Sequence, residues 1–409
     1  MAWIRHGLAV MSALIVASFG LVSAASAATA APAATAAPAA AKILPAPSGD
    51  AFYDPPSPLP SGSPGDIIWY RPSTSPVSGA SAWQVLYLST TAQGAPTAVS
   101  GTVIVPTAAY NGVRPVVAYG AGTQGWGQQC APSVEIAAGS FDEEFEINNL
   151  LAKGWAVVAT DYPGLGTPGP EQYNVGIPEG YAVLDSLRAA TRLPDAGLSA
   201  SAPMGIEGYS QGGSAGGWAA QEHASYAPEL NLKGVAMGGT PANLQAVASN
   251  INGTAFFAFL AGTASGFNAA YPSLDLNASL TPAGQTAIAQ LNTMCQIPAL
   301  VAYAGKSIQD YTVGGVNPIS TPAWQAALNA NNLGGMKPDV PIFETHGYLD
   351  EVIPYSVEQT LHNQWCAMGV MDQFTGYVGD HVLASIEDQT DMVNWLDGRF
   401  TGQPAPSNC

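Results

Sequence analysis

The feature of this sequence that most restricts its fold is an alternation of short apolar runs with longer segments of helical spacing. Six apolar runs of strand length each lead into a polar or glycine-rich loop, at 114–119, 155–160, 204–209, 232–237, 340–345 and 374–378. Helical spacing occurs between them, over 141–153, 180–192, 211–226 and 356–368. Strands that are apolar along their length are buried on both faces. The pattern therefore predicts an α/β fold with a mostly parallel sheet and helices on both faces.

Two parts of the sequence depart from this alternation. Residues 83–90 and 98–105 alternate apolar and polar, with a glycine-containing turn between them, which predicts an antiparallel hairpin. Residues 243–323 carry few charges and have the character of helices and loops. We interpret them as a helical cap inserted into a core formed by residues 50–242 and 324–409. An inserted domain suits a chain too long for one ordinary core.

The N-terminus has the composition of a secretion signal. Arg5 and His6 precede an apolar stretch over 7–21 that is too short to span a bilayer, and small residues at 22–27 offer a cleavage site after Ala27. Residues 28–49 are rich in Ala and Pro, which predicts a linker. We therefore expect a secreted, extracellular protein with a signal peptide at residues 1–27 and no membrane span.

Charge and cysteine content exclude several classes of function. The formal net charge is −18, which disfavours nucleic acids and anionic membrane surfaces as partners. The sequence has four cysteines: Cys130, Cys295, Cys366 and Cys409. Four cysteines suit two disulfides in an exported protein, and all three possible pairings are left open. No C-x-x-C spacing occurs, so we expect no metal site and no cofactor. The oligomeric state is left open.

The segment 205–216 contains the pattern G-x-S-x-G twice, around Ser210 and around Ser214. Glycine makes up 45 of 409 residues, so the bare pattern is weak and its context must decide. Ser210 follows an apolar strand and precedes a helix, which is the setting of a nucleophile on an α/β sheet, whereas Ser214 falls inside that helix. We predict Ser210 as the nucleophile. Glu207, on the same buried strand, must be paired or protonated; we favour a structural hydrogen-bonding role and keep a role in tuning the turn at Ser210 as the alternative.

A serine hydroxyl becomes a nucleophile when a histidine takes its proton and a carboxylate orients that histidine. His381 follows the last predicted strand in a loop and satisfies the chain order nucleophile, acid, histidine. We therefore predict His381 as the base. The other histidines are assigned to the signal, to the helix after the nucleophile, to a pocket wall or loop cap, and to a helix surface: His6, His223, His346 and His362 respectively.

The acid should follow the strand that comes after the cap. Asp350 and Glu351 both do, and we predict Asp350 because it is nearer the strand end, with Glu351 as the alternative. Asp339 precedes that strand and so belongs to the opposite edge of the sheet. Asp380 is the chain neighbour of His381, and adjacent side chains seldom face each other.

Ester cleavage also needs fixed N–H donors for the oxyanion of its tetrahedral intermediate. The N–H of Gln211, directly after the nucleophile, is the predicted first donor. The second is expected from the glycine-rich loop 120–125, where we favour Gln124 and keep Thr123 and Gly125 as alternatives. This loop lacks the spacing and the lysine of a phosphate-binding loop.

These residues resemble the secretory lipase family of lipase-A type, within the α/β-hydrolase superfamily. The matching segments are 130–133, 207–210, 225–231, 238–241, 350–355 and the loop at His381. The resemblance implies hydrolysis of acyl esters, typically acylglycerols, through an acyl-enzyme on Ser210. It also implies an acyl-binding tunnel in the cap, near 256–260, where a plain packed helix is the alternative. It further implies the disulfides Cys130–Cys295 and Cys366–Cys409.

Other functions stay open beside this lipase or carboxylesterase. The same triad would serve an esterase for short acyl or bulky alcohol groups, or an acyltransferase. Lipase-A enzymes continue into a flap after the last cysteine, whereas this sequence ends at Cys409, so a more open esterase is expected as the alternative. A non-catalytic surface-binding protein is disfavoured by the intact triad. The expected partner is a lipid or small-molecule ester, with contact at a lipid interface.

Overall fold

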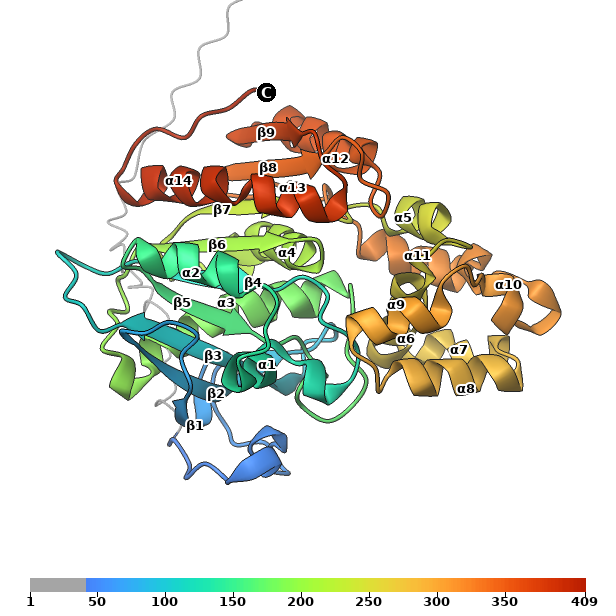
Figure 1. The fold of residues 1–409 in the computed structure, drawn as a ribbon, viewed down its shortest axis with the longest axis horizontal. Helices are drawn as coiled ribbons and strands as arrows, with labels where there is room; N and C mark the ends of the chain where they lie inside the picture. Colours follow the sequence, from blue (N-terminus) through green and yellow to red (C-terminus); the bar gives the residue numbers. More distant parts are fainter. Residues whose placement is uncertain (1–41) are drawn as a thin grey trace, which may run out of the picture. The chain divides into compact units, whose positions relative to one another are not determined.

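The computed structural model describes residues 42–409, whose strands form one nine-stranded sheet (Figure 1). The strands are β1 (Ile67–Ser73), β2 (Ala80–Thr90), β3 (Pro96–Pro106), β4 (Val116–Gly120), β5 (Ala156–Thr160), β6 (Met204–Tyr209), β7 (Leu232–Gly238), β8 (Ile342–Gly347) and β9 (Asp372–Tyr377). Their order across the sheet is β1-β2-β3-β5-β4-β6-β7-β8-β9. Pairing is antiparallel from β1 to β5 and parallel from β5 to β9.

The sheet agrees closely with the sequence pattern. All six apolar runs are the strands β4 to β9, and the alternating pair forms the hairpin β2–β3. The mostly parallel α/β sheet is therefore confirmed. The edge strand β1 was not predicted, because its sequence, Ile-Ile-Trp-Tyr-Arg-Pro-Ser, follows a Pro-rich stretch and contains a proline itself. The predicted signal peptide at 1–27, and the linker as far as residue 41, lie outside the described residues.

Helices cover both faces of the sheet and create two hydrophobic cores. On one face lie α3 (Gly176–Arg192), α4 (Gln211–Tyr226) and α12 (Tyr355–Ala367); on the other lie α1 (Pro132–Ala138), α2 (Glu144–Ala152) and α14 (Gln389–Phe400). Along β4, Val116 and Ala118 belong to the first core, whereas Val117 and Tyr119 belong to the second. Successive side chains of a strand point to opposite faces, so both sets must be apolar.

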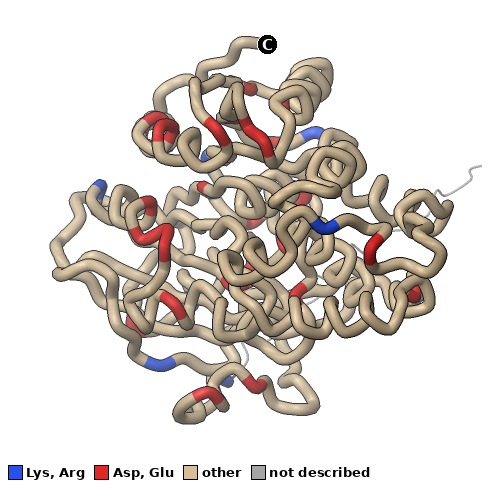
Figure 2. Tube along the Cα trace, turned by 45° about the vertical axis from the view of Figure 1, so that its right-hand side comes forward, with Lys and Arg blue, Asp and Glu red and all other residues tan. Residues whose placement is uncertain are grey.

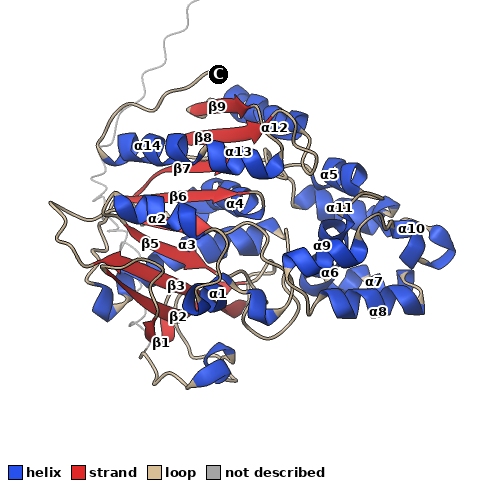
Figure 3. Cartoon of the chain, viewed as in Figure 1, coloured by secondary structure: helices blue, strands red, loops and turns tan. Residues whose placement is uncertain are grey.

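A helical insertion separates β7 from β8. It contains α5 (Leu244–Ile251), α6 (Phe257–Ala270), α7 (Leu276–Ser279), α8 (Pro282–Leu291), α9 (Gln296–Tyr303), α10 (Ile308–Tyr311) and α11 (Pro322–Ala330). Figures 1 and 3 show these helices beyond the arrowheads of the central strands, at the carboxyl edge of the sheet. The predicted boundaries 243 and 323 enclose α5 to α10 but cut through α11. The insertion has a small core of its own, which includes Phe267, Trp324 and Leu328.

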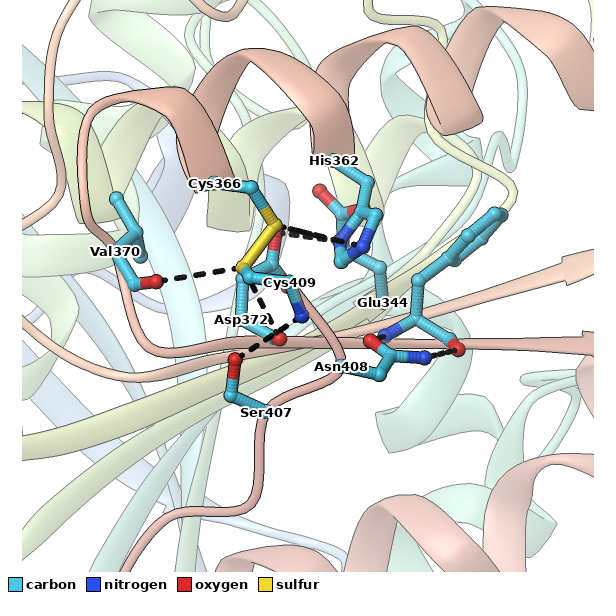
Figure 4. The surroundings of a disulfide bond; sticks show 9 residues. Glu344, His362, Cys366, Val370, Asp372, Ser407, Asn408 and Cys409 are labelled. Carbon is cyan, nitrogen blue, oxygen red and sulfur yellow. Dashed lines mark hydrogen bonds and ion pairs between the residues drawn. A yellow bond between two sulfur atoms is a disulfide. The ribbon is translucent and has the colours of Figure 1, made fainter.

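Two disulfides fasten distant segments, with the pairing that the family resemblance implies. Cys130–Cys295 joins the segment before α1 to the start of α9, and Cys366–Cys409 joins α12 to the C-terminal segment. Figure 4 shows His362 beside the second disulfide, where its Nδ1 lies 3.0 Å from Asp372 Oδ2. The expectation of a surface position for His362 is wrong: the residue is only 8% exposed, because this side of α12 faces the sheet.

Candidate active site

Ser210 lies in a tight turn between the end of β6 and the start of α4. Its backbone has φ 59° and ψ −117°, a left-handed conformation that is strained for a residue with a Cβ. The turn brings α4 so close to β4 that a Cβ at Gly212 would overlap the carbonyl oxygen of Gly120. A Cβ at Gly208 would lie 2.6 Å from Gly212 O. The two glycines around Ser210 are thus required by the close approach of backbone to backbone.

The structure brings Ser210, His381 and Asp350 into one line of contacts. His381 Nε2 lies 3.0 Å from Ser210 Oγ, and His381 Nδ1 lies 2.6 Å from Asp350 Oδ2. The sequence predicted His381 in a loop. It is instead the first residue of α13 (His381–Glu387). The helix begins there because the Asp380 side chain caps it, accepting the N–H of Leu383 at 2.8 Å.

The carboxylate of Asp350 is fixed by backbone donors as well as by the ring. Its Oδ1 accepts the N–H groups of Val352 and Ile353 at 2.9 and 2.7 Å, which leaves Oδ2 to face His381. The alternative acid, Glu351, contacts the backbone of His381 instead, by accepting its N–H at 3.2 Å. Of the two adjacent acids, Asp350 is therefore the one in contact with the imidazole.

A second histidine lies behind Asp350, and the sequence interpretation missed its contact. His346 was expected to line a pocket or cap a loop, but its Nε2 lies 2.8 Å from the carbonyl oxygen of Ile353 and 3.2 Å from Asp350 Oδ2. Its Nδ1 lies 2.5 Å from Glu358 Oε2. Burial alone would lower the pKa of His346, but its bonds with Asp350 and Glu358 raise that pKa to about 10. Burial also acts to raise the pKa of Asp350, but the bonds with both histidines lower it below its usual range.

No local signal could have identified the Glu358 contact, because Glu358 is contributed by α12, 12 residues beyond His346. His346 lies at the end of β8, four residues before Asp350. That short spacing is the only sign in the sequence that these two side chains could meet. The other serine and histidine candidates lie elsewhere. Ser214 is buried within α4, and His223 binds Asp339 at 2.9 Å.

Two sources of N–H donors lie near Ser210. Gln211 is the first residue of α4, where N–H groups have no intrahelical partner. In the glycine-rich loop, the N–H of Gly122 is occupied by Glu143, and the next residue, Thr123, lines the cavity at Ser210. Gln124 does not line this cavity, and its carbonyl accepts the N–H of Gln296 at 2.8 Å.

Ser210 separates two cavities of different chemistry. One is apolar, lies under the cap, and shares four lining residues with a second apolar cavity inside the cap: Leu260, Ala264, Ile319 and Trp324. The other has a volume of about 220 Å³ and is lined by both polar and apolar side chains, from β6, α2 and the α13–α14 region. An acyl chain and an alcohol thus have different surroundings at the same serine.

Among the described residues that are not disulfide-bonded, one buried set of side chains has the spacing to hold a metal ion. The ligand atoms of Glu344, His362 and Asp372 lie within 4.8 Å of one another (Figure 4). Burial, together with the charges of Asp372 and Glu358, raises the pKa of Glu344 well above its ordinary value. This cluster packs under α12, and none of its three residues lines the cavities at Ser210.

This chain is similar to known proteins over nearly all of its described residues. The sequence model of the family described as Secretory lipase matches residues 103–408. Secreted triacylglycerol lipase LIP7 of Malassezia globosa is 34% identical over 385 residues, which cover 88% of this chain and 81% of that protein. A probable inactive lipase of Mycobacterium tuberculosis is 30% identical, covering 89% and 84%. The structure of Candida antarctica lipase A is similar with a TM-score of 0.79 at 26% identity, covering 89% and 88%.

Proposed function

Because this chain belongs to the secretory lipase family and is therefore a secreted ester hydrolase, we propose that Ser210, His381 and Asp350 are its catalytic residues. One observation carries the proposal: the contacts from Ser210 Oγ through the His381 ring to Asp350 Oδ2 are unbroken, at 3.0 and 2.6 Å. Family membership alone does not assign a catalytic role to these three residues, since one relative is named as a probable inactive lipase.

The first half of the reaction forms an acyl-enzyme. His381 Nε2 takes the proton of Ser210 as Oγ bonds to the ester carbonyl carbon, and the carbonyl electron pair moves onto oxygen. The N–H groups of Gln211 and Thr123 stabilise that oxyanion; Thr123 replaces Gln124 in this role because it lines the cavity. Asp350 stays ionised and stabilises the imidazolium. The intermediate then collapses, and the alcohol leaves with the proton from His381.

The second half repeats these steps with water. His381 takes a proton from a water molecule, whose oxygen attacks the acyl carbon, and the returning proton releases Ser210 and the free acid. Both halves need His381 to exchange its Nε2 proton while Nδ1 stays bound to Asp350. The fixed geometry of Asp350, with two backbone N–H groups on its other oxygen, supports this requirement.

We further propose that the acyl group of the substrate is a fatty acyl chain, as in acylglycerols. The two apolar cavities share the lining residues Leu260, Ala264 and Ile319, so they adjoin, and an opening between them would give a hydrocarbon chain a path from Ser210 into the cap. Several relatives are named as triacylglycerol lipases. A path lined by apolar side chains favours a lipid ester over a peptide, whose backbone would lack hydrogen-bond partners there.

We also propose contact with a lipid surface near the active site. Exposed apolar side chains lie on α13, which begins with His381, and on α9 of the cap: Val382, Leu383, Ile386, Ile297 and Val301. Apolar side chains exposed together are typical of contact surfaces. Within the described residues, no helix has both the length and the apolar character needed to cross a membrane. Contact with the surface of a lipid droplet does not require a helix that crosses a membrane.

The test of the proposed function is Ser210→Ala, compared with Ser214→Ala. We expect the unmodified protein to hydrolyse p-nitrophenyl esters and to react with a fluorophosphonate probe. Ser210→Ala should abolish both while the thermal unfolding midpoint stays nearly constant, and Ser214→Ala should retain both. Undiminished turnover in Ser210→Ala, or absence of probe labelling in the unmodified protein, would contradict the assignment.

A further inference from the structure

We propose that Glu344, His362 and Asp372 form a binding site for one zinc ion, buried between the sheet and α12 (Figure 4). The three residues come from β8, α12 and β9, so the ion would join the last two strands of the sheet to a helix that covers them. The sequence predicted no metal site because it lacks a C-x-x-C motif, but ligands from three separate elements need no such motif. The inference is independent of ester hydrolysis, since none of these side chains lines a cavity at Ser210.

The ligand atoms of the three residues already have nearly the spacing of a metal site. All of them lie within 4.8 Å of one another. His362 Nδ1 lies 3.0 Å from Asp372 Oδ2 and 3.9 Å from Glu344 Oε2. Bonds of about 2.0–2.1 Å to a tetrahedral zinc ion place neighbouring ligand atoms about 3.3 Å apart. Small side-chain rotations would therefore bring all three atoms onto one ion.

Glu344 lacks the hydrogen bonds that a buried carboxyl group needs. It is fully buried, and neither of its carboxyl oxygens has a hydrogen-bond partner among the described residues. Asp372 Oδ1 has none there either. A protonated carboxyl group would still need an acceptor for its proton, and an ionised one needs donors or a counter-charge. Because buried polar atoms are almost always paired, the oxygens beside His362 indicate a ligand that can bind several of them at once.

The burial of these oxygens excludes a bulky ligand but leaves room for a metal ion. A water molecule approaches an oxygen atom to about 2.8 Å, whereas a zinc ion binds carboxylate oxygen at about 2.0–2.2 Å. An oxygen that no water can touch can therefore still be a metal ligand. The ion would enter as the chain folds, since β8, β9 and α12 bring the ligands together only in the folded protein.

The charge and the chemistry of the ligands favour zinc over other cations. Within residues 42–409, no lysine or arginine forms an ion pair with Glu344 or Asp372. A protonated His362 would supply one positive charge against two carboxylates, whereas a divalent ion balances both and leaves the ring neutral as a ligand. Calcium and magnesium take oxygen ligands, but zinc binds histidine nitrogen together with carboxylate oxygen.

The test measures the zinc content of the secreted protein after any affinity tag is removed. The protein is unfolded in urea with its disulfides intact, refolded with two equivalents of zinc chloride, and desalted. Mass spectrometry of the elements should find about one zinc per chain, and less than about a tenth of that in Glu344→Gln and in His362→Gln. The matched control is Glu207→Gln, which replaces a buried carboxyl bonded to the amide of Gln389 and should retain the zinc.

Two measurements on the unmodified protein keep the site testable if the variants fail to fold. Refolding with EDTA in place of zinc should lower the thermal unfolding midpoint by at least about 4 °C. X-ray absorption at the zinc edge should show only nitrogen and oxygen ligands, at about 2.0–2.2 Å.

Four results would overturn the zinc site: no zinc in the unmodified protein, equal zinc in Glu344→Gln, an unchanged midpoint with EDTA, or sulfur ligands at about 2.3 Å. Sulfur ligands would place the ion at reduced Cys366 and Cys409, whose sulfur atoms also lie near His362. Because none of these measurements uses an ester, they leave the test of Ser210 unaffected.

Discussion

At the scale of single residues, Asp350 is unusual in having an imidazole on each side. His381 lies 2.6 Å from its Oδ2 and His346 lies 3.2 Å from the same oxygen. Because the bonds with Asp350 and Glu358 raise the pKa of His346 to about 10, this ring is a cation at neutral pH. A cation beside Asp350 stabilises the ionised carboxylate, but it also opposes the positive charge that develops on His381 during catalysis.

Replacement of His346 tests this arrangement through the pH dependence of activity. His346→Gln removes the cation while keeping a polar side chain between Asp350 and Glu358. The protonated ring of His381 then no longer experiences repulsion from a neighbouring cation. The acid limb of the kcat/KM profile should therefore move to higher pH, by about one pH unit. We also expect kcat/KM to fall about tenfold at its optimum, which corresponds to about 1.4 kcal/mol in the barrier, because Asp350 loses the His346 contact that helps to hold its Oδ2 toward His381.

The matched control is His362→Gln, on a buried histidine that contacts Asp372 rather than the line of residues at Ser210. It should lower thermal stability without moving the acid limb. If His346→Gln lowers stability and also leaves the limb in place, His346 has a purely structural role. A limb that moves to lower pH would show that the ring is not a cation beside Asp350.

At the scale of secondary structure elements, the turn from β6 into α4 depends on absent side chains. Gly212→Ala would place a Cβ on the carbonyl of Gly120, so β4 and α4 would have to separate. Gly216, one turn further along α4, has room: its Cβ would meet only Ile206 Cγ2 and Val235 Cγ1, each at 3.4 Å.

We therefore expect opposite results from two identical substitutions on α4. Gly212→Ala should reduce ester hydrolysis at least a hundredfold or prevent recovery of folded protein. Gly216→Ala should fold, with unchanged or slightly higher stability, because alanine is favoured over glycine in a helix by up to about 1 kcal/mol. Circular dichroism melts and kcat/KM for p-nitrophenyl butanoate measure both effects. Full activity in Gly212→Ala would contradict the described packing.

The same element illustrates what sequence could and could not predict. Ser210 was identifiable because its signal is local: an apolar strand, a glycine on each side, and a helix. His381 and Asp350 followed from chain order, although the capping by Asp380 that starts α13 at His381 was missed. Contacts between distant segments left no local signal. Glu358 reaches His346 from α12, and Gln389 reaches Glu207 across 182 residues, so only the folded chain reveals these pairs.

The helix α6 of the insertion carries the predicted path for the acyl chain. Ala264 lines both apolar cavities, so Ala264→Trp should block their junction. We expect kcat/KM for p-nitrophenyl palmitate to fall at least tenfold relative to the butanoate ester. Ala269→Trp, on the same helix but lining neither cavity, should leave the ratio unchanged. An unchanged chain-length profile in Ala264→Trp would place the acyl chain elsewhere.

At the scale of the whole molecule, many of the acidic residues are buried rather than solvated. The sequence has 29 acidic and 11 basic residues, and Figure 2 shows acidic positions within the body of the described chain as well as at its periphery. Burial raises the pKa of five of the described carboxyls to about 8 in each case: Glu135, Glu143, Glu171, Glu207 and Asp388. Such groups bind a proton more readily in the folded protein than in the unfolded chain.

The sign of the resulting pH dependence follows from linkage. A carboxyl whose folded pKa is raised contributes stability that is complete below its unfolded pKa, near 4.5, and is lost as the pH rises through about 8. His346 acts in the same direction, because its raised pKa of about 10 means that its contribution is complete below about 6.5 and is lost as the pH approaches 10. Asp350 acts oppositely, but its lowered pKa restricts the loss to strongly acidic solution.

We therefore expect the free energy of unfolding to fall as the pH rises from 5 to 8, measured by urea titration at constant ionic strength. Glu171→Gln should make this dependence less steep, by up to about 1.4 kcal/mol per pH unit, because one buried carboxyl no longer titrates. Glu387→Gln, on an exposed acid, changes the net charge equally and should leave the slope nearly unchanged. A free energy that rises over this range would mean that the buried carboxyls are ionised in the folded protein, with partners that neutralise them.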